Sequence, residues 1–293
     1  TISYLPTMTK LLVTGADGQL GRSLRRIFDN EPQLAVTYID IDRLDLTDKS
    51  AVDTFFDNAR YDIVINCAAY TAVDLAEKNE VVCSHINTDA VRNIAEAARR
   101  HQTKVIHIST DYVFNGKNFM PYAENDVPDP QSIYGRTKLE GEAVLKAYCP
   151  QSIIIRTSWL YSEWGNNFMK TMCRLGDQRQ EIGVVCDQIG TPTYAHDLAA
   201  AIYSIITAEQ WHPGIFHFSN EGVASWYDFA VAIMHHAHKD CRVNPITTKE
   251  YPTDARRPHY SVLSKAKIKT TYGLTIPHWE ESLKKCINNY LQL

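Results

Sequence analysis

Short apolar runs alternate with segments of helical periodicity through the first half of the chain. The runs predict strands at Lys10–Thr14, Ala35–Asp40, Asp62–Asn66, Val105–Ser109 and Ile153–Thr157. The segments between them predict helices at Gly18–Phe28, Asp48–Asn58, Asn79–Arg100 and Ile133–Tyr148. Regular alternation of strands and helices predicts an α/β fold with a doubly wound, Rossmann-like parallel sheet.

The alternation becomes less regular after Thr157. Helical patterns cover Asn166–Leu175, Ala195–Thr207, Trp226–His238 and His278–Leu291, and Gly214–Phe218 reads as one more buried strand. We expect this strand to return to the first sheet. The first domain would then comprise residues 8–158 and 194–220, and a smaller, discontinuous domain would comprise 159–193 and 221–293. Residues 1–7 precede Met8 and are excluded from the expected fold.

Composition excludes several classes of protein. Apolar residues make up 44% and charged residues 22%, which is ordinary for a globular chain. The net charge of −4 comes without a basic run, so nothing indicates nucleic acid as a partner. No apolar window is long enough to cross a membrane. The seven dispersed cysteines fit reduced thiols in a cytoplasm better than a disulfide framework.

A glycine-rich turn follows the first predicted strand and opens the first helix. It reads Gly15-Ala16-Asp17-Gly18-Gln19-Leu20-Gly21. Glycines at these positions allow a tight turn, close approach of backbone to a pyrophosphate, and helix–strand packing. Asp40 follows Gly21 by 19 residues at a strand end, where an acid binds adenosine ribose hydroxyls. The context favours a dinucleotide site over a mere tight turn.

The choice between NADH and NADPH stays open. The carboxylate of Asp40 favours NAD because it repels a 2′-phosphate, whereas Arg22 and Arg43 lie near enough in sequence to offset that repulsion. Asp45 and Leu46 lie where the adenine edge would rest, or serve helix capping instead. Ala68, Ala69 and Tyr70 follow the next strand, where small residues admit a cofactor or simply pack on a helix.

Tyr134 and Lys138 lie four residues apart on a predicted helix, so they share one face. A free phenol has a pKa near 10, and a neighbouring lysine favours the phenolate. Thr110 stands at another strand end, where its hydroxyl can bond the carbonyl oxygen that Tyr134 protonates. The next residue, Asp111, could instead merely start a turn. After a dinucleotide turn, this set predicts hydride transfer.

A histidine cluster near the end of the chain invites a zinc site. His235 and His236 point to different faces of the predicted helix, and His238 and Cys241 complete no ligand set with metal-site spacing. We therefore interpret the cluster as helix surface and expect no metal.

Several motifs together resemble the extended short-chain dehydrogenase/reductase superfamily and, within it, the dTDP-4-dehydrorhamnose reductase family. The resemblance spans Leu11 to about Leu291. General superfamily motifs are Ser109-Thr-Asp-Tyr-Val-Phe114 and Tyr134-Gly-Arg-Thr-Lys-Leu-Glu-Gly-Glu142. The narrower ones are Arg156-Thr-Ser-Trp-Leu-Tyr161 and Gly165-Asn-Asn-Phe168, and Asp187-Gln-Ile-Gly-Thr-Pro-Thr193 and Arg257-Pro258 add to the match.

The resemblance implies reduction of the C4 keto group of a nucleotide sugar by NADH or NADPH. Tyr134 would donate the proton, Lys138 would lower its pKa and hold the nicotinamide ribose, and Thr110 would bond the same oxygen. Other implied substrate contacts are Asp111, Tyr112 and Trp159 at the sugar, and Asn167 and Arg257 at the diphosphate. The cofactor contacts would be Gly15, Asp17, Gly18, Gln19, Leu20, Gly21, Asp40, Asp45, Leu46, Ala68, Ala69, Tyr70, Tyr134 and Lys138.

Related activities provide alternatives. Dehydratases of this superfamily carry a glutamate where Tyr112 stands, and epimerases lack the Trp159 and Asn166-Asn167 set. A non-catalytic alternative is an NADP-binding subunit similar to the regulatory subunit of methionine adenosyltransferase, which departs from the Arg-Thr-Ser-Trp and Gly-Asn-Asn-Phe segments kept here. Some family members form magnesium-linked dimers through glutamates. Here the corresponding helix begins Ala195-His196-Asp197 and the C-terminus Asn289–Leu293 has no acid, which argues against a metal-linked dimer, while a homodimer and any magnesium dependence stay open.

Overall fold

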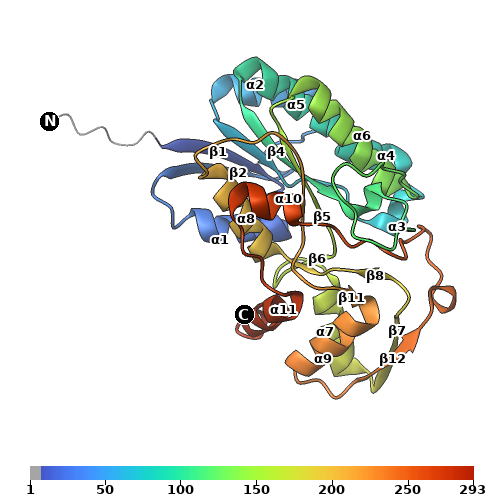
Figure 1. Ribbon diagram of the computed structural model, residues 1–293. Helices are drawn as coiled ribbons and strands as arrows, with labels where there is room; N and C mark the ends of the chain where they lie inside the picture. Colours follow the sequence, from blue (N-terminus) through green and yellow to red (C-terminus); the bar gives the residue numbers. More distant parts are fainter. Residues whose placement is uncertain (1–7) are drawn as a thin grey trace.

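A parallel six-stranded sheet forms the centre of the larger part of the molecule, as Figure 1 shows. The computed structural model describes residues 8–293; residues 1–7 lie outside the described part. The strands are β1 (Thr9–Thr14), β2 (Leu34–Ile39), β3 (Ile63–Asn66), β4 (Lys104–Thr110), β5 (Ile153–Thr157) and β10 (Gly214–Phe218). Their order is β10-β5-β4-β3-β1-β2. The expected Rossmann-like α/β fold is therefore confirmed.

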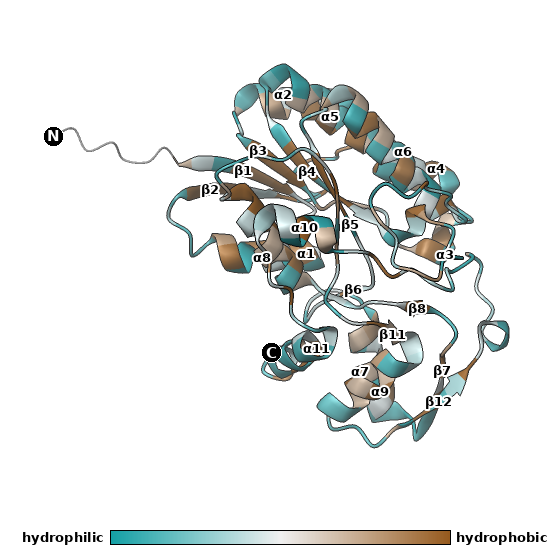
Figure 2. Ribbon diagram, viewed as in Figure 1, coloured by the Kyte–Doolittle hydropathy of each residue, from teal (hydrophilic) through white to brown (hydrophobic). Residues whose placement is uncertain are grey.

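Alternate strand residues bury opposite faces of this sheet. Leu11 and Val13 face one core with helices α1 (Gln19–Phe28) and α8 (Ala195–Ile206), whereas Leu12 faces another with α2 (Lys49–Asn58). Helices α5 (Ala90–His101) and α6 (Ile133–Tyr148) complete that second layer. Because both faces are covered, the strands are almost uniformly apolar, as their brown colour in Figure 2 shows.

The strand predicted at Gly214–Phe218 does return to the sheet, where β10 pairs in parallel with β5. Segments before and after β10 form a second, smaller body below the sheet in Figure 1. Its core contains residues of α7 (Phe168–Gln178), α9 (Trp226–His236) and α11 (Trp279–Tyr290). A parallel pair, β7 (Glu181–Val185) and β12 (Arg242–Ile246), packs against α9. Shorter two-residue strands are β6 (Leu160–Tyr161), β8 (Ile189–Gly190), β9 (Thr193–Tyr194) and β11 (Ala224–Ser225).

One segment departs from the expected division into domains. Helix α10 (Ala266–Tyr272) packs against β10, and Ile268 and Ile276 belong to the core of the large sheet. We therefore propose that residues 266–276 belong to the first domain rather than the second. The remaining boundaries, 8–158 with 194–220 and 159–193 with 221–293, stay a prediction.

The helix predicted over Asn79–Arg100 is present from Glu80 to His101, but it contains a π-helical turn. It divides into α4 (Glu80–Ser84), a π-helical turn over His85–Asp89, and α5. Inside that turn the amide of Asn87 accepts a bond from the backbone N–H of Tyr70 at 2.9 Å and donates to its carbonyl at 3.2 Å. The extra residue places this amide against the loop after β3, which apolar periodicity alone does not predict.

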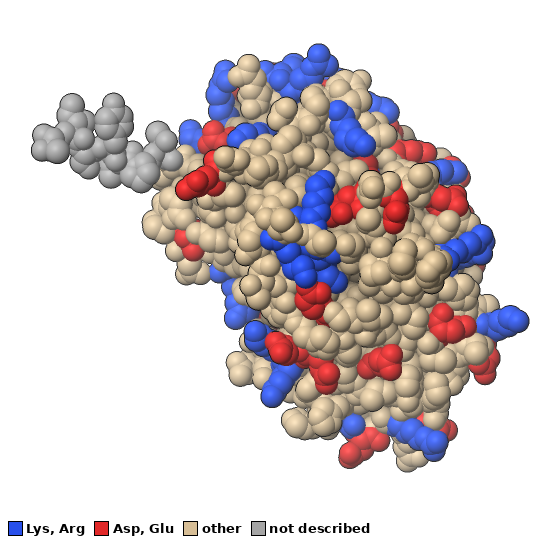
Figure 3. Space-filling view, in the orientation of Figure 1, with Lys and Arg blue, Asp and Glu red and all other residues tan. Residues whose placement is uncertain are grey.

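Further short elements complete the chain. They are helix α3 (Val73–Ala76) and the 3₁₀ turns Asp111–Val113 and Thr248–Glu250. No helix within residues 8–293 has the length and apolar character needed to span a membrane. Basic and acidic side chains are interspersed over the face seen in Figure 3.

Candidate active site

A cleft of about 800 Å³ opens at the carboxyl ends of the parallel strands. The strand order reverses between β1 and β3, because β2 lies on one side of β1 and β3 on the other. Loops leave the two sides of such a switch point in opposite directions, and ligands bind in the crevice between them. The cleft extends from the glycine-rich turn, past Tyr134 and Lys138, to Trp159 and Arg257.

The glycine-rich turn fits a dinucleotide phosphate. Gly15 has a φ of +60°, and a Cβ built there would lie 2.7 Å from the backbone nitrogen of Ala68. Gly21 packs the helix against the turn, because its Cβ would lie 2.5 Å from Ala16 Cα. The turn therefore leaves backbone exposed at the start of α1, where N–H groups favour an anion. This geometry supports the predicted binding of a pyrophosphate.

Asp40 lies beside that turn and lines the cleft. Its carboxylate accepts hydrogen bonds from the backbone N–H of Asp17 at 3.0 Å and of Ile41 at 2.8 Å. Neither Arg22 nor Arg43 lines the cleft, since each bonds a nearby carbonyl, of Asp17 and Tyr38 respectively. Asp40 is thus placed to meet ribose hydroxyls, with both arginines adjacent in the chain rather than inside the site.

The adenine end of the cleft is formed by the segment after β2. Asp45 and Leu46 both line it, together with Leu44 and Thr47. Asp45 also accepts two bonds from Thr47, and these bonds lower the pKa of its carboxyl. Asp48, not Asp45, caps the N-terminus of α2, because its side chain accepts a hydrogen bond from the backbone N–H of Ala51. The segment is therefore free to serve the cleft.

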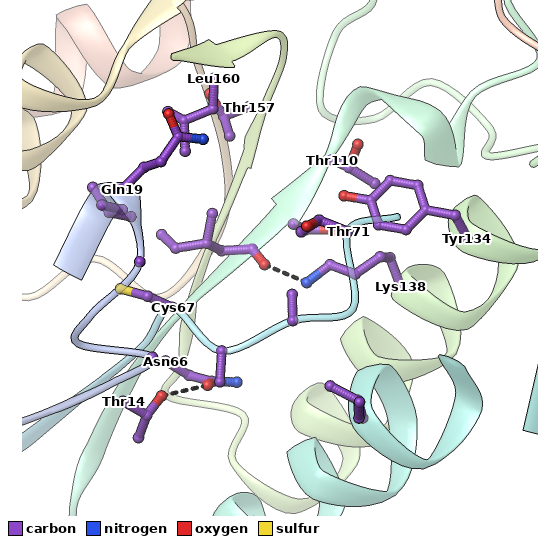
Figure 4. Close-up of a pocket in the computed structure, with 18 of the residues that line it drawn as sticks. Thr14, Gln19, Asn66, Cys67, Thr71, Thr110, Tyr134, Lys138, Thr157 and Leu160 are labelled. Carbon is purple, nitrogen blue, oxygen red and sulfur yellow. Dashed lines mark hydrogen bonds between the residues drawn. The ribbon is translucent and has the colours of Figure 1, made fainter. Parts of the chain in front are cut away.

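Three side chains from two elements meet in the middle of the cleft, as Figure 4 shows. Thr110 ends β4, and Tyr134 and Lys138 project from α6. The ammonium of Lys138 is buried and donates to the carbonyl of Ile108 at 2.6 Å. Helical spacing brings tyrosine and lysine to one face, and the strand end supplies the hydroxyl opposite them. All three predicted catalytic residues are therefore brought together.

The electrostatics of this group differ from the sequence-based expectation. Burial raises the pKa of the Tyr134 phenol above its usual value, and the hydroxyl of Thr110, not Lys138, is the main opposing influence. Burial also lowers the pKa of Lys138 to about 8, with Glu142 acting in the opposite sense. Desolvation is the larger effect because the low-dielectric cleft disfavours either charge. Here Tyr134 is a protonated donor.

Asp111 is buried beside Thr110, whose hydroxyl donates to its Oδ1 at 3.0 Å. Its second oxygen has no hydrogen-bond partner among residues 8–293. Burial raises the pKa of this carboxyl to about 6. The hydroxyl of Ser261 opposes this rise in pKa. A buried acceptor without a full set of hydrogen bonds is costly, and Asp111 lines the cleft, so this carboxyl is a candidate acceptor for a ligand hydroxyl.

Two stacked indoles form the far wall of the cleft. Trp159 adopts a left-handed φ of 47° and stacks on Trp226 with ring centroids 3.6 Å apart. A Cβ on Gly190 would lie 2.7 Å from the Trp159 ring, so glycine is required there. Both indoles line the cleft. They offer an apolar, planar surface in the same cleft as Tyr134.

Arg257 reaches the cleft from the C-terminal half of the chain. Its guanidinium forms an ion pair with Asp74 at 2.6 Å and donates to the hydroxyl of Tyr112 at 3.2 Å. The neighbouring Arg256 is directed instead toward Gln131, at 3.4 Å, and does not line the cleft. Only Arg257 of the two arginines therefore reaches the cleft. Its ion-pair partner, Asp74, was not predicted from the sequence.

Four predicted contacts lie outside the lining of the cleft: Asp17, Gly21, Tyr70 and Asn167. Asn167 caps α7 by accepting from Lys170 N–H at 3.0 Å, and its amide donates to Gln19 at 2.9 Å. Its neighbour Asn166 lines the cleft instead. Sequence reasoning also missed Cys67, Thr71, Ile86, Ser158, Gly165 and Trp226. Of these, Ser158 and Gly165 belong to quoted motifs, whereas the others belong to none of them.

No group of three or more potential ligand side chains within residues 8–293 is arranged to hold a metal ion. His236 is largely buried, with its Nε2 3.4 Å from the carboxylate of Glu280. The seven cysteines are free thiols.

Comparisons with known proteins agree with this geometry. The model of the RmlD substrate binding domain family matches residues 8–292. The dTDP-4-dehydrorhamnose reductase of Aggregatibacter actinomycetemcomitans is 44% identical over 287 residues, covering 94% of this chain and 98% of that protein. The resemblance inferred from the motifs is confirmed.

Solved structures extend the comparison. A dTDP-4-dehydrorhamnose reductase of Clostridium acetobutylicum superposes with a TM-score of 0.94 at 44% identity, covering 97% of this chain and 100% of that one. The Bacillus anthracis dTDP-4-dehydrorhamnose reductase, solved in complex with NADP, gives 0.93 at 40% identity, with 96% and 99% covered. By sequence along almost its whole length and by fold, this chain belongs to the RmlD family of dTDP-4-dehydrorhamnose reductases.

Proposed function

We propose that this chain reduces the C4 keto group of dTDP-4-dehydro-L-rhamnose to give dTDP-L-rhamnose, with NADPH or NADH as reductant. Family membership supports the reaction class and the substrate. The observation that carries the proposal is the convergence of Thr110, Tyr134 and Lys138 in one cleft. That group lies between a phosphate-binding turn and the indole pair, so a cofactor and a sugar would meet there.

The cofactor would be held by the first half of the chain. The Gly15–Gly21 turn and the start of α1 would bind the pyrophosphate, and Asp40 would accept bonds from the adenosine ribose. Lys138 would donate to the nicotinamide ribose. When bound, the reduced nicotinamide supplies the hydride.

The proton would come from Tyr134. Because burial raises the pKa of its phenol, the group is neutral at working pH and can donate to the C4 oxygen as negative charge develops there. Thr110 would hydrogen-bond the same oxygen and stabilise that charge. Lys138 would stabilise the tyrosinate left behind, which makes the donation easier in the transition state.

The remaining side chains would hold the nucleotide sugar. Asp111, with its unbonded oxygen, would accept from a sugar hydroxyl, and Trp159 would cover one face of the ring. Arg257, already oriented by Asp74 and Tyr112, would bind the diphosphate. Given the position of Asn167, its neighbour Asn166 is the better candidate for a direct contact.

The test is direct. The purified protein is incubated with dTDP-4-dehydro-L-rhamnose and either reduced nicotinamide, and loss of nicotinamide absorbance is followed while the product is identified by mass. We expect absorbance loss that depends on the sugar and a product two hydrogens heavier. Binding of NADPH without any turnover would instead favour the non-catalytic subunit.

Two further properties belong to the proposal. Free thiols throughout the described part of the chain are compatible with a cytoplasmic location. A homodimer is also compatible with the chain, and sedimentation in the presence and absence of chelator would determine whether one forms and whether it needs a metal.

A further inference from the structure

Gln19 lies between the part of the cleft proposed to bind the cofactor and the part proposed to bind the nucleotide sugar. It is the first residue of α1, directly after the glycine-rich turn, and it lines the cleft. Figure 4 shows it on the same side as Leu160, opposite Tyr134 and Lys138. Its side chain therefore reaches from the phosphate-binding turn toward the segment that follows β6.

That segment, residues 162–167, contacts the carboxamide of Gln19. The amide of Asn167 donates to Gln19 Oε1 at 2.9 Å, and the hydroxyl of Ser162 lies 3.1 Å from the same oxygen. At its tip Gly165 has a φ of +66°, and a Cβ there would lie 3.2 Å from Gln19 Cγ. We call residues 162–167 the bridging loop. Its contact with Gln19 includes both hydrogen bonds and close packing.

The bridging loop faces the cleft and is anchored elsewhere. Gly165 and Asn166 line the cleft directly. The loop residue Glu163 is buried, where it pairs with Arg26 at 3.0 Å and accepts from Tyr194 at 3.1 Å. Because these bonds do not involve Gln19, the loop keeps its attachment to α1 and to the smaller body if Gln19 is changed. What Gln19 determines is the position of the loop tip.

The oxygen and the nitrogen of the Gln19 amide have different roles in this proposal. Its oxygen accepts from the bridging loop, whereas its Nε2 has no protein partner within residues 8–293 and is free to donate to a phosphate oxygen. A donor bond at Nε2 would fix the plane of the amide and so keep Oε1 directed at Asn167. A ligand that binds only one conformation of a side chain stabilises that conformation. It therefore favours binding of a second ligand that requires the same conformation.

We propose that Gln19 is a positioning residue that couples the two binding sites, so that bound cofactor tightens the binding of the nucleotide sugar through the bridging loop. The proposal rests on the proposed function, since it needs both ligands to bind this cleft. Coupling of this kind is reciprocal: the nucleotide must tighten cofactor binding by the same factor.

The experiment measures the dissociation constant of dTDP by calorimetry, with and without saturating NADP⁺, and then the converse. For the unchanged protein we expect dTDP to bind about fivefold tighter or more when NADP⁺ is present, and the converse factor to match. A factor within twofold of unity would overturn the proposal. If neither NADP⁺ nor dTDP binds at all, the proposed function itself fails instead.

Matched variants locate the coupling. Gln19→Met keeps the length of the side chain and removes the acceptor, so the factor should fall to about one. Gln19→Glu keeps an acceptor for Asn167 but removes the Nε2 donor, so the factor should also fall to about one, and the added charge weakens NADP⁺ binding. Asn167→Asp keeps the cap on Lys170 N–H and removes the donor to Gln19 together with its bonds to the carbonyls of Ser162 and Trp164, so coupling should be lost. Full coupling in Gln19→Met or in Gln19→Glu would contradict the role of the Gln19 amide.

Discussion

Glu142 of α6 and Arg156 of β5 form a buried, two-pronged ion pair, with Nε–Oε1 and Nη2–Oε2 distances of 2.9 and 2.7 Å. Ser109 donates to the same carboxylate at 2.5 Å. Ser109 precedes Thr110 on β4, and Glu142 lies four residues after Lys138 on α6. This pair therefore fixes the helix that carries Tyr134 and Lys138 against the strand that carries Thr110.

Breaking the pair from one side should be strongly destabilising. Glu142→Gln leaves the guanidinium of Arg156 buried without a counter-charge, which costs about 3–5 kcal/mol. The double variant with Arg156→Met should recover most of that loss because no charge is left unpaired. Urea denaturation of the single and double variants measures both. A Glu142→Gln protein as stable as the original would show that the pair contributes little.

Removing the proton donor should abolish turnover without disturbing binding. Tyr134→Phe keeps the ring, which packs edge-on to Tyr112 with centroids 5.5 Å apart, and removes only the hydroxyl. We expect kcat to fall by about 10²–10⁴-fold. The dissociation constant of NADPH and the Tm should stay nearly unchanged. Turnover close to that of the original protein would mean that another group supplies the proton.

The buried carboxyl of Asp111 makes stability depend on pH. Its folded pKa, raised by burial to about 6, exceeds the ordinary aspartate value of 3.8. The folded state therefore holds the proton more tightly, so stability falls as pH rises from about 4 to about 6. Asp111→Asn should remove that loss and add about 3 kcal/mol above pH 6, by conversion of the pKa shift.

At pH 4 the original protein and the Asp111→Asn variant should have similar free energies of unfolding. Thermal unfolding measured between about pH 4 and about pH 6 therefore separates the effect of ionisation from the effect of packing. The same variant should bind the nucleotide sugar more weakly, because the carboxylate acceptor is lost. Equal stability at every pH would show that Asp111 ionises in the fold as readily as in the unfolded chain.

Arg257 should control affinity for the nucleotide sugar. Arg257→Ala removes a charge-assisted contact worth about 1.5–3 kcal/mol, so the KM for the substrate should rise about tenfold or more. The KM for NADPH should barely change. Arg256→Ala is the matched control, because that side chain is directed toward Gln131 outside the cleft. Similar effects of the two substitutions would refute a specific diphosphate role for Arg257.

Asp40 should influence the choice of cofactor. Asp40→Ala removes an acceptor for the ribose hydroxyls and a charge that repels a 2′-phosphate, so the Kd should rise more for NADH than for NADPH. Because the carboxylate also supports the N–H groups of Asp17 and Ile41, some loss is expected for both cofactors. Equal changes in the two dissociation constants would place Asp40 outside ribose recognition.

The sequence by itself determined the succession of strands and helices along the chain and the positions of the site motifs. Strands such as Ile153–Thr157 and Gly214–Phe218 and the helix Ile133–Tyr148 have the predicted bounds. These features are local: an apolar run, a 3.6-residue period, or a glycine that must follow a strand. Tyr134 and Lys138 share a face for the same reason, since four residues on a helix fix their relation.

Tertiary structure alone decided the contacts between distant segments. The pairing of Arg257 with Asp74 joins residues 183 apart, and the bond from Asn167 to Gln19 joins residues 148 apart. The buried pair of Glu142 and Arg156, and the π-turn that brings Asn87 to Tyr70, depend on how α6, β5 and α5 pack. No local periodicity encodes these distances, because they follow from the packing of side chains across layers. For that reason the motif identified Asn167, whereas the fold turned it toward Gln19 and left Asn166 at the cleft.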